Sequence, residues 1–201
     1  MKRLICTLLV LCTAFLAACS STVVTPDGVY TTRLETTDTP TNFVQIELEN
    51  GGIIVIELYP DVAPKTVENF QKLVSEHFYD GIIFHRVMQG FMIQGGDPEG
   101  TGYGGSAEPI VGEFGSNGIS NPLRHERGVI SMARQLNDNN SASSQFFIMH
   151  ETKSNLDGDY AAFGRVIAGM ETVDWIAAQP TNGSDKPLSD ITMKEVRFVN
   201  P

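Results

Sequence analysis

The sequence predicts one mainly β domain with two helices. Short stretches of strand-forming residues separated by turn residues recur between residues 43 and 199. Only two stretches, after Pro64 and after Gly169, have the apolar spacing of an amphipathic helix. A doubly wound α/β protein would need a helix after nearly every strand, so this pattern favours an all-β barrel. With 201 residues, the chain is long enough to bury the core of one such domain.

The first eighteen residues have the pattern of a secretory signal peptide. Two basic residues, Lys2 and Arg3, precede the apolar run Leu4–Leu16, which is short for a membrane span. The segment Leu16-Ala17-Ala18-Cys19 then resembles the lipobox of bacterial lipoproteins, in which the cysteine is acylated and becomes the first residue. We therefore expect residues 1–18 to be removed and Cys19 to carry lipid.

This resemblance also implies a location in the cell envelope. In a bacterium with two membranes, the non-acidic Ser20 favours the outer membrane, with the protein facing the periplasm. An ordinary signal peptide with an incidental cysteine, and an uncleaved anchor, are the alternatives. Cys6 and Cys12 would leave with the signal, so a disulfide, a cysteine nucleophile and a cysteine-bound metal are not expected in the folded domain.

Residues 19–41 are expected to form the lipidated cysteine and a flexible tether. They are rich in Ser, Thr and Pro and have almost no periodic apolar pattern. A flexible chain of this length has a root-mean-square reach of about 25 Å. The folded domain is then expected to cover residues 42–200.

Charge and motif spacing argue against several other functions. Without its first eighteen residues the chain has 12 basic and 24 acidic residues, since Lys2 and Arg3 are lost, and no long basic cluster. Nucleic acid is therefore not an expected partner, and the membrane would be reached through the lipid anchor only. The four histidines do not have metal-ligand spacing. The run 100–105 fits G-x-G-x-x-G, but Pro98 and Pro109 disfavour the strand and helix of a dinucleotide site, so no metal or cofactor is expected.

The sequence pattern in the first half of the domain predicts a hairpin and a helix. Apolar and polar residues alternate from Phe43, and Asn50-Gly51-Gly52 can supply the tight turn before the strand that ends at Tyr59. Pro64 suits the first turn of a helix that runs to about Glu76 and has one apolar face.

The second half predicts loops, strands and a second helix. Residues 98–122 are rich in glycine and read as loop. Strands are expected over 128–133, 144–150, 161–167 and 191–199, and a short helix is expected after Gly169.

Two stretches combine apolar, amide and cationic side chains. The first runs from Phe84 to Asp97 and places Arg86 close to large apolar residues and to Gln94. The second contains Gln145 and Phe147, which share one face of a strand because side chains alternate, while Phe146 faces the other side. These strands are expected to build one shared surface.

Seven short motifs include these two stretches and continue along the chain: Phe84-His85-Arg86, Gly90-Phe91-Met92, Gln94-Gly95-Gly96-Asp97, Ser131-Met132-Ala133, Ser144-Gln145-Phe146-Phe147-Ile148, Leu156-Asp157-Gly158 and Phe163-Gly164. In their order and spacing they resemble the signatures of the cyclophilin-type peptidyl-prolyl isomerases. The resemblance covers roughly residues 42–199. The resemblance implies a closed eight-stranded antiparallel barrel capped by two helices. It also implies a monomer that isomerises X-Pro bonds in proline-containing peptides and in unfolded exported proteins.

The resemblance implies a role for each residue of the shared surface. Arg86 and Gln94 would be catalytic, and Gln145 would orient the substrate backbone. The peptide would be held by main-chain contacts at Ala133 and Arg134. The slot for the proline ring would be lined by Phe91, Met92, Phe147, Leu156 and Tyr160.

Two positions depart from the family pattern. Asn155 stands where many members have Trp, so we expect low sensitivity to cyclosporin, and Tyr160 stands where His is common. A proline-binding adaptor or chaperone without catalysis is the alternative function. The arginine favours the enzyme, because docking of proline alone needs only an apolar slot.

Overall fold

The computed structural model describes residues 21–24, 28 and 30–201. Within these residues the main sheet has nine strands in the order β3-β11-β4-β5-β10-β8-β9-β7-β6, and each neighbouring pair is antiparallel. Its strands are β3 Thr36–Thr37, β4 Phe43–Leu48, β5 Ile53–Leu58, β6 Arg86–Met88, β7 Met92–Gly95, β8 Val129–Met132, β9 Phe146–Met149, β10 Ala162–Ala168 and β11 Met193–Val199. The helices are α1 Pro64–Ser75 and α2 Met170–Ala177, with short 3₁₀ helices at Gly115–Asn117 and Ser154–Leu156.

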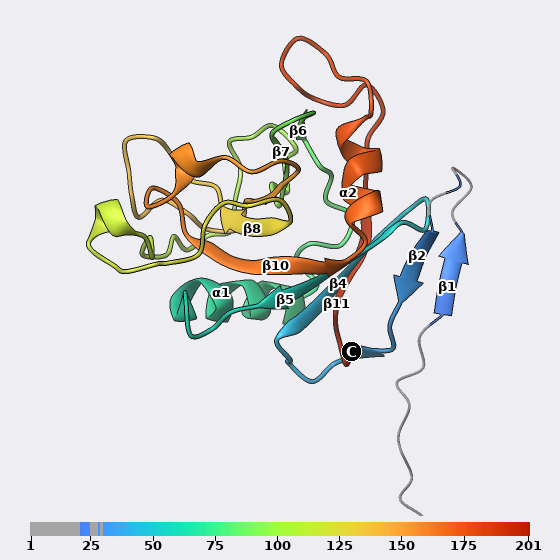
Figure 1. Cartoon of the computed structure of the whole chain (residues 1–201), viewed down its shortest axis with the longest axis horizontal. Helices are drawn as coiled ribbons and strands as arrows, with labels where there is room; N and C mark the ends of the chain where they lie inside the picture. The colour runs from blue at the N-terminus through green and yellow to red at the C-terminus, as the bar shows by residue number, and fades with distance from the viewer. Residues whose placement is uncertain (1–20, 25–27, 29) are drawn as a thin grey trace, which may run out of the picture.

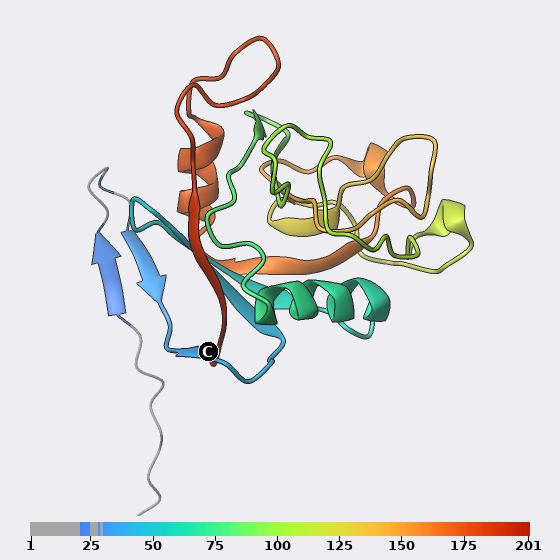
Figure 2. The same ribbon diagram turned by 180° about the vertical axis from the view of Figure 1, so that it is seen from behind.

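The predicted class, mainly β with two helices, is confirmed within the described residues. The hairpin of β4 and β5 and the helices α1 and α2 occur where the sequence predicts them. Figures 1 and 2 show α1 lying along β10, with α2 at the far end of the same strand.

The sheet curls, but it is not a continuous closed barrel of eight strands. Its ends meet where the segment before β6 approaches the start of β11. There, the Gly81 N–H donates to Met193 O at 2.8 Å, and Ile83 and Thr192 form an isolated bridge. The resemblance therefore predicted the curvature, whereas the ends are joined by a short bridge rather than by a full ladder.

The main core lies between the concave face of the sheet and α1. Phe70 of α1 packs against Tyr79, Phe146 and Phe163, with ring centroids 5.1, 5.8 and 5.2 Å away. The buried Glu113 carboxylate caps this helix, because its oxygens accept the N–H groups of residues 65 and 66 at 3.0 and 2.8 Å. The core and this cap hold the sheet that carries the shared surface.

The expected tether is partly structured. β1 (Ser21–Val24) and β2 (Tyr30–Arg33) form a separate hairpin, and β3 pairs with the end of β11. Figure 1 shows the hairpin beside the main sheet, on the side of α2. Leu34 packs against Ile53, Val55 and Val199 on the outer face of the sheet, and its N–H donates to Gln45 at 2.8 Å.

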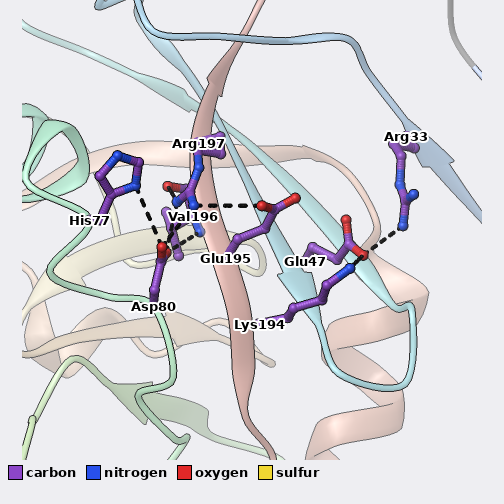
Figure 3. A network of polar contacts seen from close by, with 8 residues as sticks. All are labelled: Arg33, Glu47, His77, Asp80, Lys194, Glu195, Val196 and Arg197. Atoms are coloured by element: carbon purple, nitrogen blue, oxygen red, sulfur yellow. Dashed lines mark hydrogen bonds and ion pairs between the residues drawn. The ribbon is translucent and has the colours of Figure 1, made fainter.

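An ion-pair network reinforces this attachment (Figure 3). Arg33 and Lys194 both approach Oε1 of the buried Glu47, at 2.7 and 2.9 Å. Arg197 of the same strand β11 binds Asp80 at 2.8 Å. The packed part of the protein therefore begins before residue 42. This earlier start could not be predicted from the Thr-rich segment itself, because the residues that it contacts lie far away in the chain.

The predicted signal peptide, the predicted lipobox and Cys19 lie outside the described residues. In the part of the chain that the structure describes, no helix is long and apolar enough to cross a membrane.

Candidate active site

Strand register brings the central polar residues together. Arg86 of β6 lies opposite Gln94 of β7, and Gln94 lies opposite Phe147 of β9. The Gln94 amide donates to Gln145 Oε1 at 2.8 Å, and the Gln145 amide donates to Gly104 O at 2.7 Å. A chain of polar contacts therefore runs from the arginine across the strands to the glycine-rich loop.

The guanidinium of Arg86 remains accessible. Its side chain is 43% exposed, and its Nη1 lies 3.5 Å from Gln94 Oε1. Its Nη2 lies 3.2 Å from the sulfur of Met88, and its Nε lies 3.7 Å from a carboxylate oxygen of Asp185. These contacts are long or involve a weak acceptor. They orient the group while leaving its donors available to a bound molecule.

The predicted apolar residues of the slot form one cluster on the outer face of β7, β8 and β9. This cluster is separate from the main core, which confirms that Phe146 and Phe147 face opposite sides of β9. Its members with the expected slot role are Phe91, Met92, Phe147, Leu156 and Tyr160, and Ala133 packs beside them.

A cavity of about 600 Å³ lies next to the apolar cluster. Gln94, Ala133, Arg134 and Gln145 line one side of it, and the loop from residue 102 to 106 lines another. The Ala133 N–H already donates to Gln145 O at 2.9 Å, so a peptide would have to use other main-chain groups of this segment.

The side chain of Arg134 has a structural role that the sequence did not reveal. Its guanidinium carbon lies 4.9 Å from the ring centre of Tyr160 and 5.3 Å from that of Phe114. The same group donates to the carbonyl oxygens of Gln135 at 2.9 Å and Asp159 at 3.0 Å. These contacts hold Tyr160 against Phe147, whose ring centre lies 5.7 Å away.

His125 packs against the slot residue Phe147, a role that the sequence did not predict. Its ring is stacked on Phe147 with centroids 5.9 Å apart. Its nitrogens lie 3.1 Å from Asp157 Oδ1 and 3.1 Å from Ser131 Oγ. Burial lowers the pKa of His125, which favours the neutral ring. The signal available in the sequence was only Asp157 in the Leu156-Asp157-Gly158 motif.

Asp97 organises the glycine-rich loop beside the cavity. Its buried carboxylate accepts N–H groups from Glu99 at 2.8 Å, Thr101 at 2.9 Å and Gly102 at 2.6 Å. Burial by itself would raise the pKa of Asp97, but these donors outweigh it and hold the pKa below its ordinary value of 3.8. At a pH above the ordinary pKa of 3.8, the charged carboxylate therefore stabilises the folded state. This stabilisation is lost as the pH falls through the lower pKa that Asp97 has in the folded protein.

We expect Asp97→Asn to lower the free energy of unfolding by about 2 kcal/mol near neutral pH, because the loop N–H groups lose a charged acceptor. The difference from the unmodified protein should shrink as the pH falls below 3.8, where the Asp97 carboxyl of the unfolded chain becomes protonated, and it should be lost once the pH has passed the lower pKa of the folded protein. Urea unfolding followed between pH 7 and pH 2 measures this. The exposed Asp190→Asn is the control, and a difference that stays constant down to pH 2 would contradict the assignment.

Within the described residues, no group of three or more His, Cys, Asp or Glu side chains could hold a metal ion. The site combines the Arg86 cation, the amides of Gln94 and Gln145, the apolar cluster and the cavity, and this arrangement suits binding and polarisation of a peptide.

Comparison with known proteins agrees with this arrangement. The model of the family described as cyclophilin type peptidyl-prolyl cis-trans isomerase/CLD matches residues 43–198. Peptidyl-prolyl cis-trans isomerase B of Bacillus subtilis is 46% identical over 150 residues, which cover 75% of this chain and 93% of that protein. Peptidyl-prolyl cis-trans isomerase-like 3 of Homo sapiens is 44% identical over 153 residues, which cover 75% of this chain and 92% of that protein.

A solved structure of a cyclophilin-type isomerase is also similar to this chain. The crystal structure of a cyclophilin-type isomerase of Cryptosporidium parvum, in the presence of the dipeptide Ala-Pro, is similar with a TM-score of 0.73 and 34% identity. The similarity covers 79% of this chain and 99% of that one. The chain therefore belongs to the cyclophilin-type peptidyl-prolyl cis-trans isomerase family.

Proposed function

We propose that this protein accelerates rotation about X-Pro bonds and that Arg86 is its catalytic cation. Rotation must overcome the loss of amide resonance, a barrier of about 18–20 kcal/mol, and no bond is broken. In the twisted amide the prolyl nitrogen regains a localised lone pair. A cation aimed at this nitrogen binds the twisted state more strongly than the planar one, which lowers the barrier.

The position of Arg86 is the observation that supports this proposal most strongly. The accessible guanidinium lies in register with Gln94, and Gln94 lies in register with Phe147 of the apolar cluster. A proline ring in that cluster would place its nitrogen near the polar chain. Gln94 would orient the guanidinium, and Gln145 would orient the peptide backbone. The Ala-Pro dipeptide used with the Cryptosporidium parvum relative supports a proline-containing substrate.

A binding function without catalysis is the second candidate. Tyr103, which lines the cavity, is 95% exposed, and Leu136, which follows the lining residue Gln135 in the chain, is 79% exposed. Exposed large apolar side chains suit an adaptor or chaperone for unfolded chains. Refolding of a client protein limited by proline isomerisation separates the two functions. The enzyme predicts that the unmodified protein accelerates refolding and that Arg86→Ala does not. The adaptor predicts that neither protein accelerates this refolding and that both raise the yield of folded client equally.

We also propose that the protein is a lipid-anchored envelope protein, monomeric, which assists the folding of exported proteins. The lipobox ending at Cys19 supports the anchor, and the absence of long basic clusters leaves the lipid as the membrane attachment. In a bacterium with two membranes, Ser20 supports the outer membrane facing the periplasm.

We expect metabolic labelling with palmitate to mark the unmodified protein and not Cys19→Ser, because this cysteine is the proposed site of lipid attachment. Cys12→Ser is the matched control, since this cysteine lies inside the expected signal peptide. Label that persists in Cys19→Ser would contradict the proposed anchor.

A further inference from the structure

The side chain of His150 connects the turn between β6 and β7 to helix α2. His150 directly follows β9, and its side chain is 14% exposed. Its Nδ1 lies 3.0 Å from the N–H of Gly90, and its Nε2 lies 3.3 Å from Asp174 Oδ1 of α2. The turn, the end of β9 and the helix therefore meet at one imidazole.

These contacts fix which nitrogen carries the proton. The Gly90 N–H is a donor, so Nδ1 must present its lone pair, and the proton of the neutral ring is then on Nε2, facing Asp174. Arg127 holds this arrangement from both sides, because it binds Asp174 Oδ2 at 2.7 Å and donates to His150 O at 2.7 Å.

The turn held in this way carries Phe91, the expected wall of the proline slot. The N–H groups of His150 and Glu151 both donate to Phe91 O, at 2.9 and 3.2 Å, and the Phe91 N–H donates to Met88 O at 3.0 Å. Gly90 has a positive φ of 76°, a conformation that glycine adopts without strain and that turns the chain into Phe91. Both peptide groups that flank the Cα of Phe91 are thus hydrogen-bonded, and His150 binds the turn at two adjacent residues.

We propose that His150 is a positioning residue for substrate binding: its Nε2-protonated imidazole holds the Gly90–Phe91 turn so that Phe91 forms one wall of the slot. This inference rests on the proposed role of Phe91 in binding the proline ring. In the proposed function Arg86, and not His150, reaches the reacting amide, so the effect of His150 belongs to binding of the peptide rather than to the rotation step.

Three substitutions separate the two nitrogens. In His150→Asn the side-chain oxygen can occupy the place of Nδ1 and accept the Gly90 N–H. In His150→Gln the polar end reaches the place of Nε2 and leaves the Gly90 N–H without that acceptor. His150→Leu removes both contacts. We expect KM for a short X-Pro peptide to rise about tenfold in the Leu and Gln variants and to stay within about twofold in the Asn variant, with kcat little changed in all three.

The tautomer is tested on the unmodified protein and so needs no variant to fold. A long-range ¹⁵N–¹H spectrum at neutral pH should show His150 protonated at Nε2 only. The Gly90 N–H should exchange faster with solvent in the Leu variant, which has no acceptor for it, than in the Asn variant. A proton on Nδ1, or an unchanged KM in a Leu variant that melts as a folded protein, would overturn the inference.

Phe91→Ala distinguishes failure of this inference from failure of the proposed function. If KM is unchanged in His150→Leu and raised in Phe91→Ala, the slot is as proposed and His150 does not position it. If KM is unchanged in both, the inference fails together with the proposed role of Phe91.

Discussion

Replacement of Arg86 by alanine is expected to lower kcat/KM for an X-Pro peptide by about 10²- to 10³-fold, which corresponds to about 2.7–4 kcal/mol of lost transition-state stabilisation. The loss should lie in kcat, because the cation acts on the twisted amide and the apolar slot remains intact. The side chain is 43% exposed, so the melting temperature should change little. A coupled peptide assay with a kcat and KM determination measures the effect.

Two further substitutions control for charge and for fold. Arg86→Lys keeps the charge but loses the planar fork of donors, so an intermediate rate is expected. Arg165 of β10 has a similar exposure, pairs with Glu126 and does not line the cavity. Arg165→Ala should therefore leave kcat and KM unchanged. A rise in KM with an unchanged kcat in Arg86→Ala would mean that the arginine binds the peptide without acting on its rotation.

Replacement of Phe147 by alanine is expected to weaken peptide binding by at least tenfold and to lower the free energy of unfolding by about 3–5 kcal/mol. The ring is 5% exposed and lies between His125 and Tyr160, so its removal opens the base of the slot and leaves a cavity. Urea unfolding and peptide titration by NMR at low temperature measure the two effects separately.

Phe146→Ala is the matched control, because the same ring is removed from the adjacent residue of the same strand. Phe146 faces the main core and is fully buried. We expect a similar loss of stability, while the folded fraction keeps its affinity for the peptide. Equal affinities of the two variants would show that the outer cluster is not the binding slot.

The sequence predicted the parts of the structure that depend on local pattern. Alternation in β9 correctly separated Phe146 from Phe147, and the Asn50-Gly51-Gly52 turn correctly placed the hairpin of β4 and β5. Pro64 marked the start of α1. In each case, residues within a few positions of one another determine the conformation.

Features that depend on distant contacts could not be predicted in this way. β3 forms only because residues near the end of the chain offer it an edge to pair with. His125 and His150 have ordinary sequence surroundings, and their roles follow from contacts with Phe147 and with Gly90. The family motifs gave the proposed members of the site, whereas the long contacts of Arg86 and the stacking of Arg134 on Tyr160 required the structure.

The most direct test of the catalytic role of Arg86 is cis/trans exchange in a short X-Pro peptide followed by NMR, with the unmodified protein and with Arg86→Ala. Rapid exchange is expected with the unmodified protein. With the variant, exchange should be strongly slowed while the peptide resonances still shift on binding. Exchange that is equally fast with both proteins would contradict the assignment of Arg86 as the catalytic cation.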